Sequence, residues 1–227
     1  MKVTLSLENT VSYDVSVMVD VLRASTTITA GLNNFEKIIP CFSPQEAFKL
    51  KQKYNGVIAG ERGGAQIEGF EMGNSPQMVE EFESDKKTLI LTTSNGTRIL
   101  ENMKSKVLVG CMNNAKAVAL KSQKLATSHI DVVMAGVKGE FAIEDFLATG
   151  EILFWISQNN ECELSEFAQC AVLASRDYNR VKKAFLNSGS GKRLRKLNYE
   201  DDIKYCLQKN TSENVAIYAN NELTLYI

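Results

Sequence analysis

The chain has 227 residues, of which 44% are hydrophobic and 23% charged, and its formal net charge is −1. These proportions are ordinary for a globular protein and argue against intrinsic disorder over most of the chain. The densest basic stretch, residues 192–196, is closely followed by acidic residues 200–202, so the sequence indicates no broad basic surface. We therefore expect no nucleic-acid partner.

The cysteine pattern indicates reduced thiols. The five cysteines are odd in number and widely spaced, and no two of them form a Cys-x-x-Cys pair. This pattern favours neither a disulfide framework nor a zinc ribbon, so we expect a cytoplasmic enzyme. The first residues lack the apolar segment of a signal peptide, and no apolar run approaches the roughly 20 residues that cross a bilayer, so we expect no membrane association.

Short β-branched runs alternate with longer helical patterns through the first 135 residues. The predicted strands cover residues 15–20, 36–39, 57–59, 88–92, 106–109 and 130–135. The predicted helices cover residues 25–33, 44–53, a segment starting at 76, 96–103 and 114–125. The strands are uniformly apolar, which is typical of a parallel sheet with helices on both faces. We therefore expect a three-layer α/β/α fold with a mostly parallel sheet.

The C-terminal part has a different, mixed character. Residues 142–187 are mostly helical in pattern, and residues 187–191 are predicted to form a turn or linker. A short helix over 201–208 precedes strands at 215–218 and 223–226, which Asn220 and Asn221 should join as a hairpin. We expect residues 1–135 to form an α/β domain that carries the main site motifs. Residues 136–227 would add a helical segment and terminal strands across a soft boundary, which also allows one compact unit.

Four polar clusters each follow a predicted strand. In open α/β sheets, ligands bind outside the carboxyl ends of the strands, so four such clusters are a stronger signal than one. In the first, Asp20 could hold a divalent cation and Arg23 could bind phosphate with its two-pronged guanidinium. Ser25 and Thr26 then begin a helix whose free N–H groups attract anions. A salt bridge with a helix cap explains this cluster equally well.

The second cluster offers Glu61 and Arg62 beside two glycines, and leads into a long loop that ends at Asn74 and Ser75. Loops of this length are often functional. The alternative is a flexible surface loop.

In the third cluster, Thr93 precedes Asn95, Gly96 and Thr97, a combination that suggests a backbone nest for an anion. A plain strand-to-helix turn is the alternative. The fourth cluster places Glu144 and Asp145 near a helix start, where they could favour the helix dipole or bind a metal.

Two familiar phosphatase classes do not fit. The Asp-x-Asp motif of aspartate-nucleophile phosphatases is absent, because Leu22 occupies its second position. Cys170 and Arg176 have the spacing of a cysteine-phosphatase loop, but they lie in a predicted helix rather than in a strand–loop–helix cradle. We interpret that spacing as coincidence.

The ordered set of motifs resembles the 2-phosphosulfolactate phosphatase family. The motifs that carry the resemblance are residues 20–28, 60–64, 69–76 and 92–97, with weaker similarity at 135–136 and 144–145. The resemblance covers roughly residues 17–150 and is weak beyond, apart from Asp202 and Ile203. Ser25 and Ser94 stand where threonine is more usual, and Asn198 stands where glycine is expected.

The resemblance implies an α/β/α homodimer that uses Mg²⁺ to hydrolyse 2-phosphosulfolactate to sulfolactate and phosphate, a step in coenzyme M biosynthesis. We expect Asp20 and Glu61 to be catalytic and, with Asp145, to hold the metal. The expected substrate-binding residues are Arg23, Ser25, Thr26, Arg62, Asn74, Ser75, Thr93, Asn95, Gly96 and Thr97. A water activated by the metal is favoured as nucleophile over Asp20 itself. Another phosphorylated hydroxy acid, or anion binding without turnover, would use the same clusters.

Overall fold

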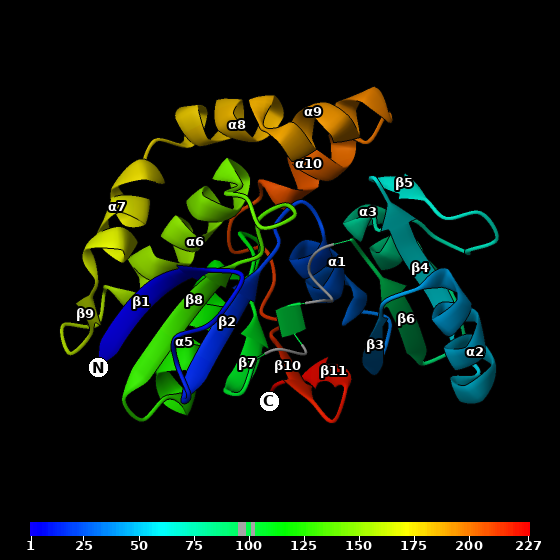
Figure 1. Cartoon of the computed structure of the whole chain (residues 1–227), viewed down its shortest axis with the longest axis horizontal. Coiled ribbons are helices and arrows are strands. Elements are labelled where there is room, and N and C mark those ends of the chain that lie inside the picture. Colours follow the sequence, from blue (N-terminus) through cyan, green and yellow to red (C-terminus); the bar gives the residue numbers. More distant parts are fainter. Residues whose placement is uncertain (95–98, 101–102) are drawn as a thin grey trace.

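The computed structural model describes residues 1–94, 99–100 and 103–227 (Figure 1). The predicted helix over 96–103 falls largely outside these residues. The strands are β1 (Lys2–Leu7), β2 (Val15–Val19), β3 (Lys37–Cys41), β4 (Val57–Arg62), β5 (Ala65–Gln66), β6 (Thr88–Thr92), β7 (Lys106–Val109), β8 (His129–Met134), β9 (Glu163–Leu164), β10 (Ala216–Ala219) and β11 (Glu222–Leu225). The described helices are α1 (Ala24–Gly31), α2 (Pro44–Tyr54), α3 (Pro76–Glu81), α5 (Ala115–Leu125), α6 (Ile143–Ile156), α7 (Glu166–Ala174), α8 (Tyr178–Asn187), α9 (Gly189–Lys196) and α10 (Glu200–Cys206).

One mixed sheet contains all of these strands, in the order β5-β4-β6-β3-β11-β10-β7-β2-β8-β1-β9. Strands β4, β6 and β3 form one parallel block. Strands β7, β2, β8, β1 and β9 form a second parallel block. The antiparallel hairpin β10–β11 lies between the blocks and pairs with both. The mostly parallel sheet and the α/β/α arrangement confirm the predicted fold class.

Both faces of the sheet are buried, as the apolar strands indicated. In β2, Val17 and Val19 contribute to the core under α5 to α10, whereas Met18 contributes to the opposite core under α1 and α3. In β4, Ala59 belongs to that second core, and Ile58 faces a smaller core under α2. Because successive side chains of a strand point to opposite faces, each of these strands is packed from both sides.

Local sequence signals explain several of the element ends. Ser43 and Ser75 accept hydrogen bonds from the N–H groups of Glu46 (3.1 Å) and Met78 (3.2 Å), and a proline follows each serine at the first helical position. A serine cap followed by proline is a strong helix start. In the β10–β11 hairpin, Asn220 and Asn221 have φ values of 52° and 61°, which confirms the predicted turn.

Two parts of the chain differ from the predictions. Strand β1 was not predicted, although residues 2–7 pair in parallel with β8. Residues 187–191 were predicted as a turn or linker; they include a tight turn at Ser188, between the end of α8 at Asn187 and the start of α9 at Gly189, and do not form a linker. Ser188 caps α9 by accepting a hydrogen bond from the Gly191 N–H (3.0 Å). A Cβ on Gly191 would lie 1.9 Å from the Phe185 carbonyl oxygen, so glycine permits this close junction of two helices.

The two sequence segments share the sheet. Strands β10 and β11, from the last part of the chain, lie between β7 and β3, from the first part (Figure 1). The predicted boundary near residue 135 stays a prediction. The pairing of β10 with β7 and of β11 with β3 joins the segments on its two sides in one sheet. Within the part of the chain that the structure describes, no helix combines the length and apolar character needed to cross a membrane.

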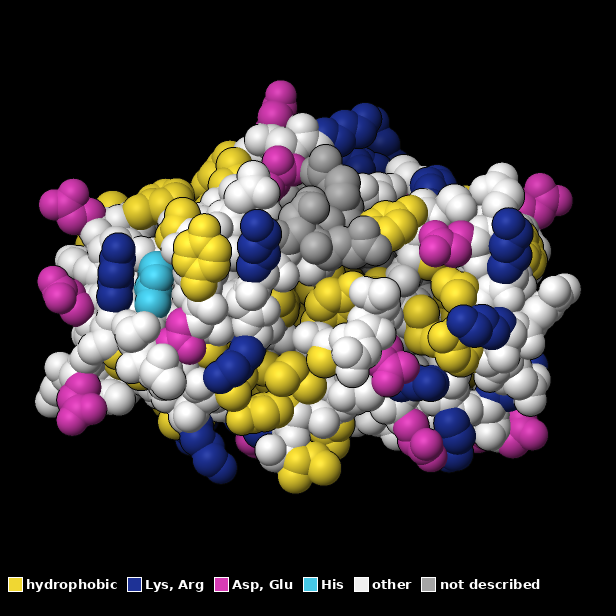
Figure 2. Space-filling model, turned by 60° about the horizontal axis from the view of Figure 1, so that its bottom comes forward, with side chains coloured by type: hydrophobic (Ala, Val, Ile, Leu, Met, Phe, Trp, Pro, Cys, Tyr) yellow, Lys and Arg dark blue, Asp and Glu magenta, His cyan; other side chains and the backbone are white. Residues whose placement is uncertain are grey.

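The face shown in Figure 2 carries basic and acidic side chains side by side, apart from one group of basic side chains at its upper edge. Exposed hydrophobic side chains on this face are interspersed with polar ones. The absence of a nucleic-acid partner stays a prediction.

Asp14 fixes the turn that leads into β8. Its Oδ2 accepts hydrogen bonds from the backbone N–H groups of Thr127 (2.7 Å), Ser128 (2.7 Å) and His129 (3.1 Å). Burial alone would raise the pKa of Asp14, but these hydrogen bonds outweigh it and lower the pKa from 3.8 to about 2. The charged form of Asp14 therefore stabilises the folded chain.

We expect this stabilisation to be present above about pH 4 and to be lost as the pH falls towards about 2. An Asp14→Asn variant should therefore lose less stability than the wild type over that range, as measured by urea unfolding at each pH. Asp85→Asn, which alters an exposed acid, is the control and should follow the wild type. Equal losses in wild type and Asp14→Asn would contradict this account.

Candidate active site

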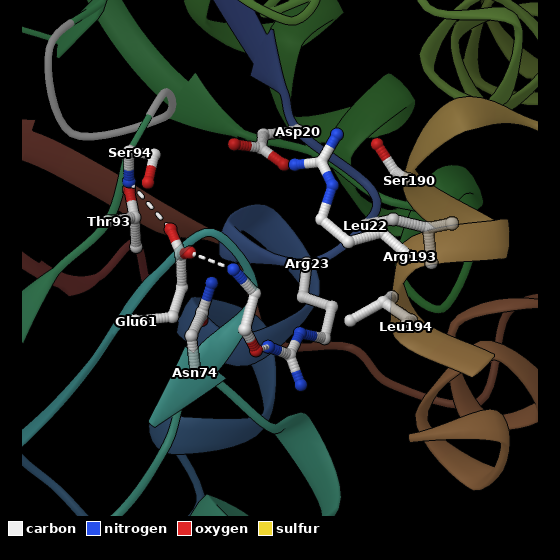
Figure 3. A pocket seen from close by; sticks show the side chains of 11 residues that line it. Asp20, Leu22, Arg23, Glu61, Asn74, Thr93, Ser94, Ser190, Arg193 and Leu194 are labelled. Atoms are coloured by element: carbon white, nitrogen blue, oxygen red, sulfur yellow. Dashed lines mark hydrogen bonds between the residues drawn. The ribbon is translucent and has the colours of Figure 1, made fainter. Parts of the chain in front are cut away.

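A pocket lies where the ends of β2 and β4 meet, and α9 borders it (Figure 3). The described residues that line it come from five separate segments of the chain. They are Asp20, Leu22, Arg23, Glu61, Gly64, Asn74, Thr93, Ser94, Ser190, Arg193 and Leu194. The structure thus brings together five residues that were predicted for the site, namely Asp20, Arg23, Glu61, Asn74 and Thr93.

The meeting of Asp20 and Glu61 depends on the twist of the sheet. The pairings through the β10–β11 hairpin give the block of β2 and the block of β4 opposite senses. Six strand-to-strand steps separate β2 from β4. At about 20–25° per step, the accumulated twist is roughly 120–150°, which turns the carboxyl end of β4 back towards that of β2. Both acids can therefore face one pocket.

The backbone around Asp20 is held by the start of α1. The Asp20 N–H donates to Ser25 Oγ (3.2 Å), and the Ser25 N–H donates to the Asp20 carbonyl (2.8 Å). Thr26 Oγ1 donates to the carbonyl of Val21 (3.0 Å). Ser25 and Thr26 do not line the pocket. Their hydroxyl groups instead hold the backbone at Asp20 and Val21. Asp20 itself is buried, with 7% of the residue exposed.

Glu61 is held by two backbone donors. Its Oε2 accepts from the Gly64 N–H (2.6 Å) and its Oε1 accepts from the Ser94 N–H (2.7 Å), as the dashed lines in Figure 3 show. Gly64 has φ +92° in the tight turn from β4 to β5, a conformation that L side chains rarely adopt. The carboxylate is therefore fixed in orientation, while each oxygen keeps acceptor capacity towards the pocket.

Arg23 lines the pocket, but its guanidinium is engaged by the protein. Nη1 donates to Asp202 Oδ2 (2.5 Å) and Nη2 donates to the carbonyl of Gly64 (2.7 Å). The guanidinium carbon lies 4.6 Å from the ring centre of Tyr199. Asp202 Oδ1 also accepts from Ser75 Oγ (2.6 Å). Arg23 and Ser75 thus connect α10 to the site. Both were predicted to bind substrate, and in the structure both donate hydrogen bonds to Asp202.

Arg62 does not line the pocket. It follows Glu61 within β4, where neighbouring side chains point to opposite faces, so Arg62 points away from the face that Glu61 occupies. Its guanidinium donates to the carbonyls of Glu61 (2.6 Å) and Phe42 (2.7 Å) and to Thr92 Oγ1 (3.0 Å). The structure therefore separates the two arginines that were predicted to bind substrate.

Asn74 is 3% exposed and lines the pocket, and its amide points into the space beside Glu61 (Figure 3). Its Oδ1 is buried without a hydrogen-bond partner among the residues that the structure describes. A buried polar atom without a partner is uncommon and calls for a ligand or an ordered water. The amide oxygen of Asn74 is therefore a candidate ligand atom for a metal ion or acceptor for a bound molecule in the pocket.

Asp145, in the first turn of α6, lies beside the pocket without lining it. Its Oδ1 accepts from the Val21 N–H (2.9 Å) and its Oδ2 accepts from the Gly136 N–H (3.0 Å). Burial raises the pKa of Asp145 well above its usual value, and the charges of Asp20 and Glu144 raise it further. Asp145 thus connects the loop after β2 to the loop after β8. The effect of the Asp20 charge on its pKa shows that the two carboxyl groups lie close together.

Six of the described lining residues were not predicted for the site. Leu22, Gly64 and Ser94 lie within the polar clusters, next to predicted residues. Ser190, Arg193 and Leu194 belong to α9 and lie outside all four clusters. The stretch of basic residues at 192–196 was the available signal, but a local pattern does not show where a helix packs. The predicted residues Asn95, Gly96 and Thr97 lie outside the described part of the chain. Their place in the site stays a prediction.

Sequence comparisons identify relatives along almost the entire chain. Residues 3–221 match the family model described as 2-phosphosulpholactate phosphatase. The chain is 44% identical to the 2-phosphosulfolactate phosphatase of Methanothermobacter thermautotrophicus, over 99% of this chain and 96% of the relative. It is 38% identical to a probable 2-phosphosulfolactate phosphatase of Carboxydothermus hydrogenoformans, over 86% of this chain and 82% of the relative. It is 33% identical to a probable 2-phosphosulfolactate phosphatase of Clostridium acetobutylicum, over 95% of this chain and 94% of the relative.

The chain belongs to the 2-phosphosulfolactate phosphatase family. This confirms the family that the motifs indicated and identifies the chain as an enzyme, a phosphoric monoester hydrolase. The match also extends far beyond residue 150, where the resemblance of the motifs weakens. Helices α9 and α10, which border and support the pocket, therefore lie within the family match.

The donor atoms of the pocket suit a hard divalent cation. No group of three or more His, Cys, Asp or Glu side chains is placed to hold a metal among residues 1–94, 99–100 and 103–227. The pocket offers the carboxylates of Asp20 and Glu61 and the unpartnered amide oxygen of Asn74. Mg²⁺ is commonly bound through one or two carboxylates, with waters and substrate phosphate as its other ligands. This donor set fits Mg²⁺, and Asp145 lies outside it.

The thiols do not form an alternative phosphatase site. None of the described lining residues of the pocket is a cysteine. Burial raises the pKa of Cys41 to about 12 and also raises that of Cys111 and Cys206. Cys170 is exposed and lies in the middle of α7, in agreement with the predicted helix. The coincidental spacing of Cys170 and Arg176 therefore forms no phosphate-binding loop.

Proposed function

We propose that this enzyme uses Mg²⁺ to hydrolyse 2-phosphosulfolactate to sulfolactate and phosphate, and that the reaction serves coenzyme M biosynthesis. The observation that supports the proposal is the convergence of Asp20 and Glu61 on one pocket lined by arginine side chains. The substrate carries phosphate, carboxylate and sulfonate. Such a substrate needs a site that combines cations with donors of hydrogen bonds.

Asp20, Glu61 and Asn74 would hold the metal in this proposal. When bound to these oxygens, Mg²⁺ supplies charge neutralisation and activation of water. The two N–H groups that hold Glu61 prevent its carboxylate from rotating away from the pocket. The contacts between α1 and the backbone of Asp20 hold the other carboxylate in place. Phosphoryl transfer depends mainly on positioning and charge neutralisation, and both are provided by these fixed groups.

The test is phosphate release from a panel of phosphorylated two- and three-carbon acids, with Mg²⁺ and with a chelator. We expect 2-phosphosulfolactate to have the highest kcat/KM. Phospholactate, which lacks the sulfonate, should be slower by roughly ten- to a few-hundred-fold, because one charged hydrogen-bonding contact contributes about 1.5–3 kcal/mol. Equal rates for both compounds would contradict the assigned substrate, and turnover in the chelator would contradict the assigned metal.

A further inference from the structure

Helix α9 carries four basic residues, and one of them faces the pocket. Lys192, Arg195 and Lys196 do not line it, whereas Arg193 does. Figure 3 shows the guanidinium of Arg193 extending across the pocket towards the carboxylate of Asp20. This arginine lies far along the chain from the predicted site motifs.

The guanidinium of Arg193 has no hydrogen-bond or ion-pair partner in the part of the chain that the structure describes. Arg23 and Arg62 differ in this respect, because the guanidinium of each donates to oxygen atoms of the protein. Arg193 can therefore turn to a ligand without breaking a hydrogen bond or an ion pair to any of the described residues.

The backbone of Arg193 is nevertheless well fixed. The adjacent Leu194 is 3% exposed and packs in the main core, and Ser188 caps the helix. The aliphatic stem of Arg193 passes over Gly64, since a Cβ built on Gly64 would lie 3.6 Å from its Cδ. Gly64 is also the residue that donates to Glu61 and accepts from Arg23. The stem is thus held against the turn that orients the site.

The charges in the pocket indicate what the guanidinium would bind. The charge of Arg23 is balanced by Asp202, 2.5 Å away. Among the described lining residues, Arg193 then provides the cation that is available for a doubly charged phosphoryl group.

We propose that Arg193 binds the phosphoryl group of the substrate and stabilises the negative charge on its oxygens during transfer. The guanidinium fork matches two phosphoryl oxygens, whereas lysine offers a point charge. Arg193 would move from its position facing Asp20 to the phosphoryl group when substrate enters. This inference rests on the proposed function, because it takes the transferred group to lie beside Asp20 and Glu61.

The kinetic test compares Arg193→Ala and Arg193→Lys with Arg195→Ala, a matched control on the same helix that does not line the pocket. Arginines that stabilise the transition state in phosphoryl transfer contribute about 10³–10⁵-fold to kcat, so Arg193→Ala should lower kcat at least about 100-fold. Arg193→Lys should recover only part of the loss, and Arg195→Ala should match the wild type. Guanidinium ion added to Arg193→Ala should restore part of kcat, which a purely structural role would not allow. An active wild type with an equally active Arg193→Ala would overturn the inference and leave the proposed function standing.

Binding of inorganic phosphate separates the two proposals even if no substrate of the panel is turned over. Calorimetry with Mg²⁺ present should show at least about tenfold weaker phosphate binding in Arg193→Ala than in the wild type, while Arg195→Ala is unchanged. Equal phosphate affinity in all three proteins would overturn the role of Arg193. Failure of the wild type to bind phosphate would overturn both proposals.

Discussion

Asp20→Asn should reduce Mg²⁺-dependent phosphate release at least about 1000-fold, because the substitution removes a charged metal ligand and keeps the shape of the side chain. Its effect on folding should be small. The backbone of Asp20 is held by Ser25, a contact that does not use the Asp20 side chain. The loss should therefore occur in activity and not in stability.

The neighbouring Asp145 strengthens this expectation. After burial, the charge of Asp20 is the largest cause of the raised pKa of Asp145. Removing that charge relieves this repulsion, and asparagine keeps the shape of the side chain, so Asp20→Asn should change the melting temperature little. Asp201→Asn, an exposed acid in α10, is the control and should keep full activity. Full activity in Asp20→Asn would remove Asp20 from the site.

Asp202→Ala should cause the largest loss of stability. The Arg23–Asp202 pair is buried, with side chains that are 2% and 4% exposed. Removing one partner of a buried ion pair costs about 3–5 kcal/mol, since the other charge stays buried without its partner. At about 2–4 °C per kcal/mol, the melting temperature should fall by roughly 6–20 °C. Thermal unfolding measured by circular dichroism tests this expectation.

Two further variants isolate the cause. Asp201→Ala removes an adjacent acid with a 77% exposed side chain and should change stability by no more than about 0.5 kcal/mol. The double variant Arg23→Ala/Asp202→Ala should be less destabilised than the sum of its two single variants, because it leaves no unpaired buried charge. A strictly additive double variant would show that the pair is not coupled.

The sequence predicted the fold class because its signals are local. Uniformly apolar strands indicated burial on both faces, and serine–proline pairs marked two helix starts. Strand β1 was missed because residues 2–7 alternate in polarity and so lack the uniformly apolar pattern that marks the predicted strands. The twist that brings β2 and β4 together is a property of the whole sheet, and no local pattern encodes it.

The site was predicted in part for the same reason. The expectation that ligands bind at the carboxyl ends of strands indicated Asp20, Glu61, Asn74 and Thr93, and these residues line one pocket. It could not show that Arg23 is bound by Asp202, a residue 179 positions away in the chain. The orientation of Arg62 was missed because the predicted strand ends at residue 59, whereas β4 continues to Arg62 and the alternation of a strand points this side chain to the other face.

A crystal structure of the wild-type protein grown with Mg²⁺ and inorganic phosphate tests the central claim most directly. We expect the metal on the carboxylates of Asp20 and Glu61, with phosphate beside it in contact with Arg193. Metal and phosphate bound away from this pocket, for example in the polar cavity lined by Thr29 and Asn113, would contradict the account.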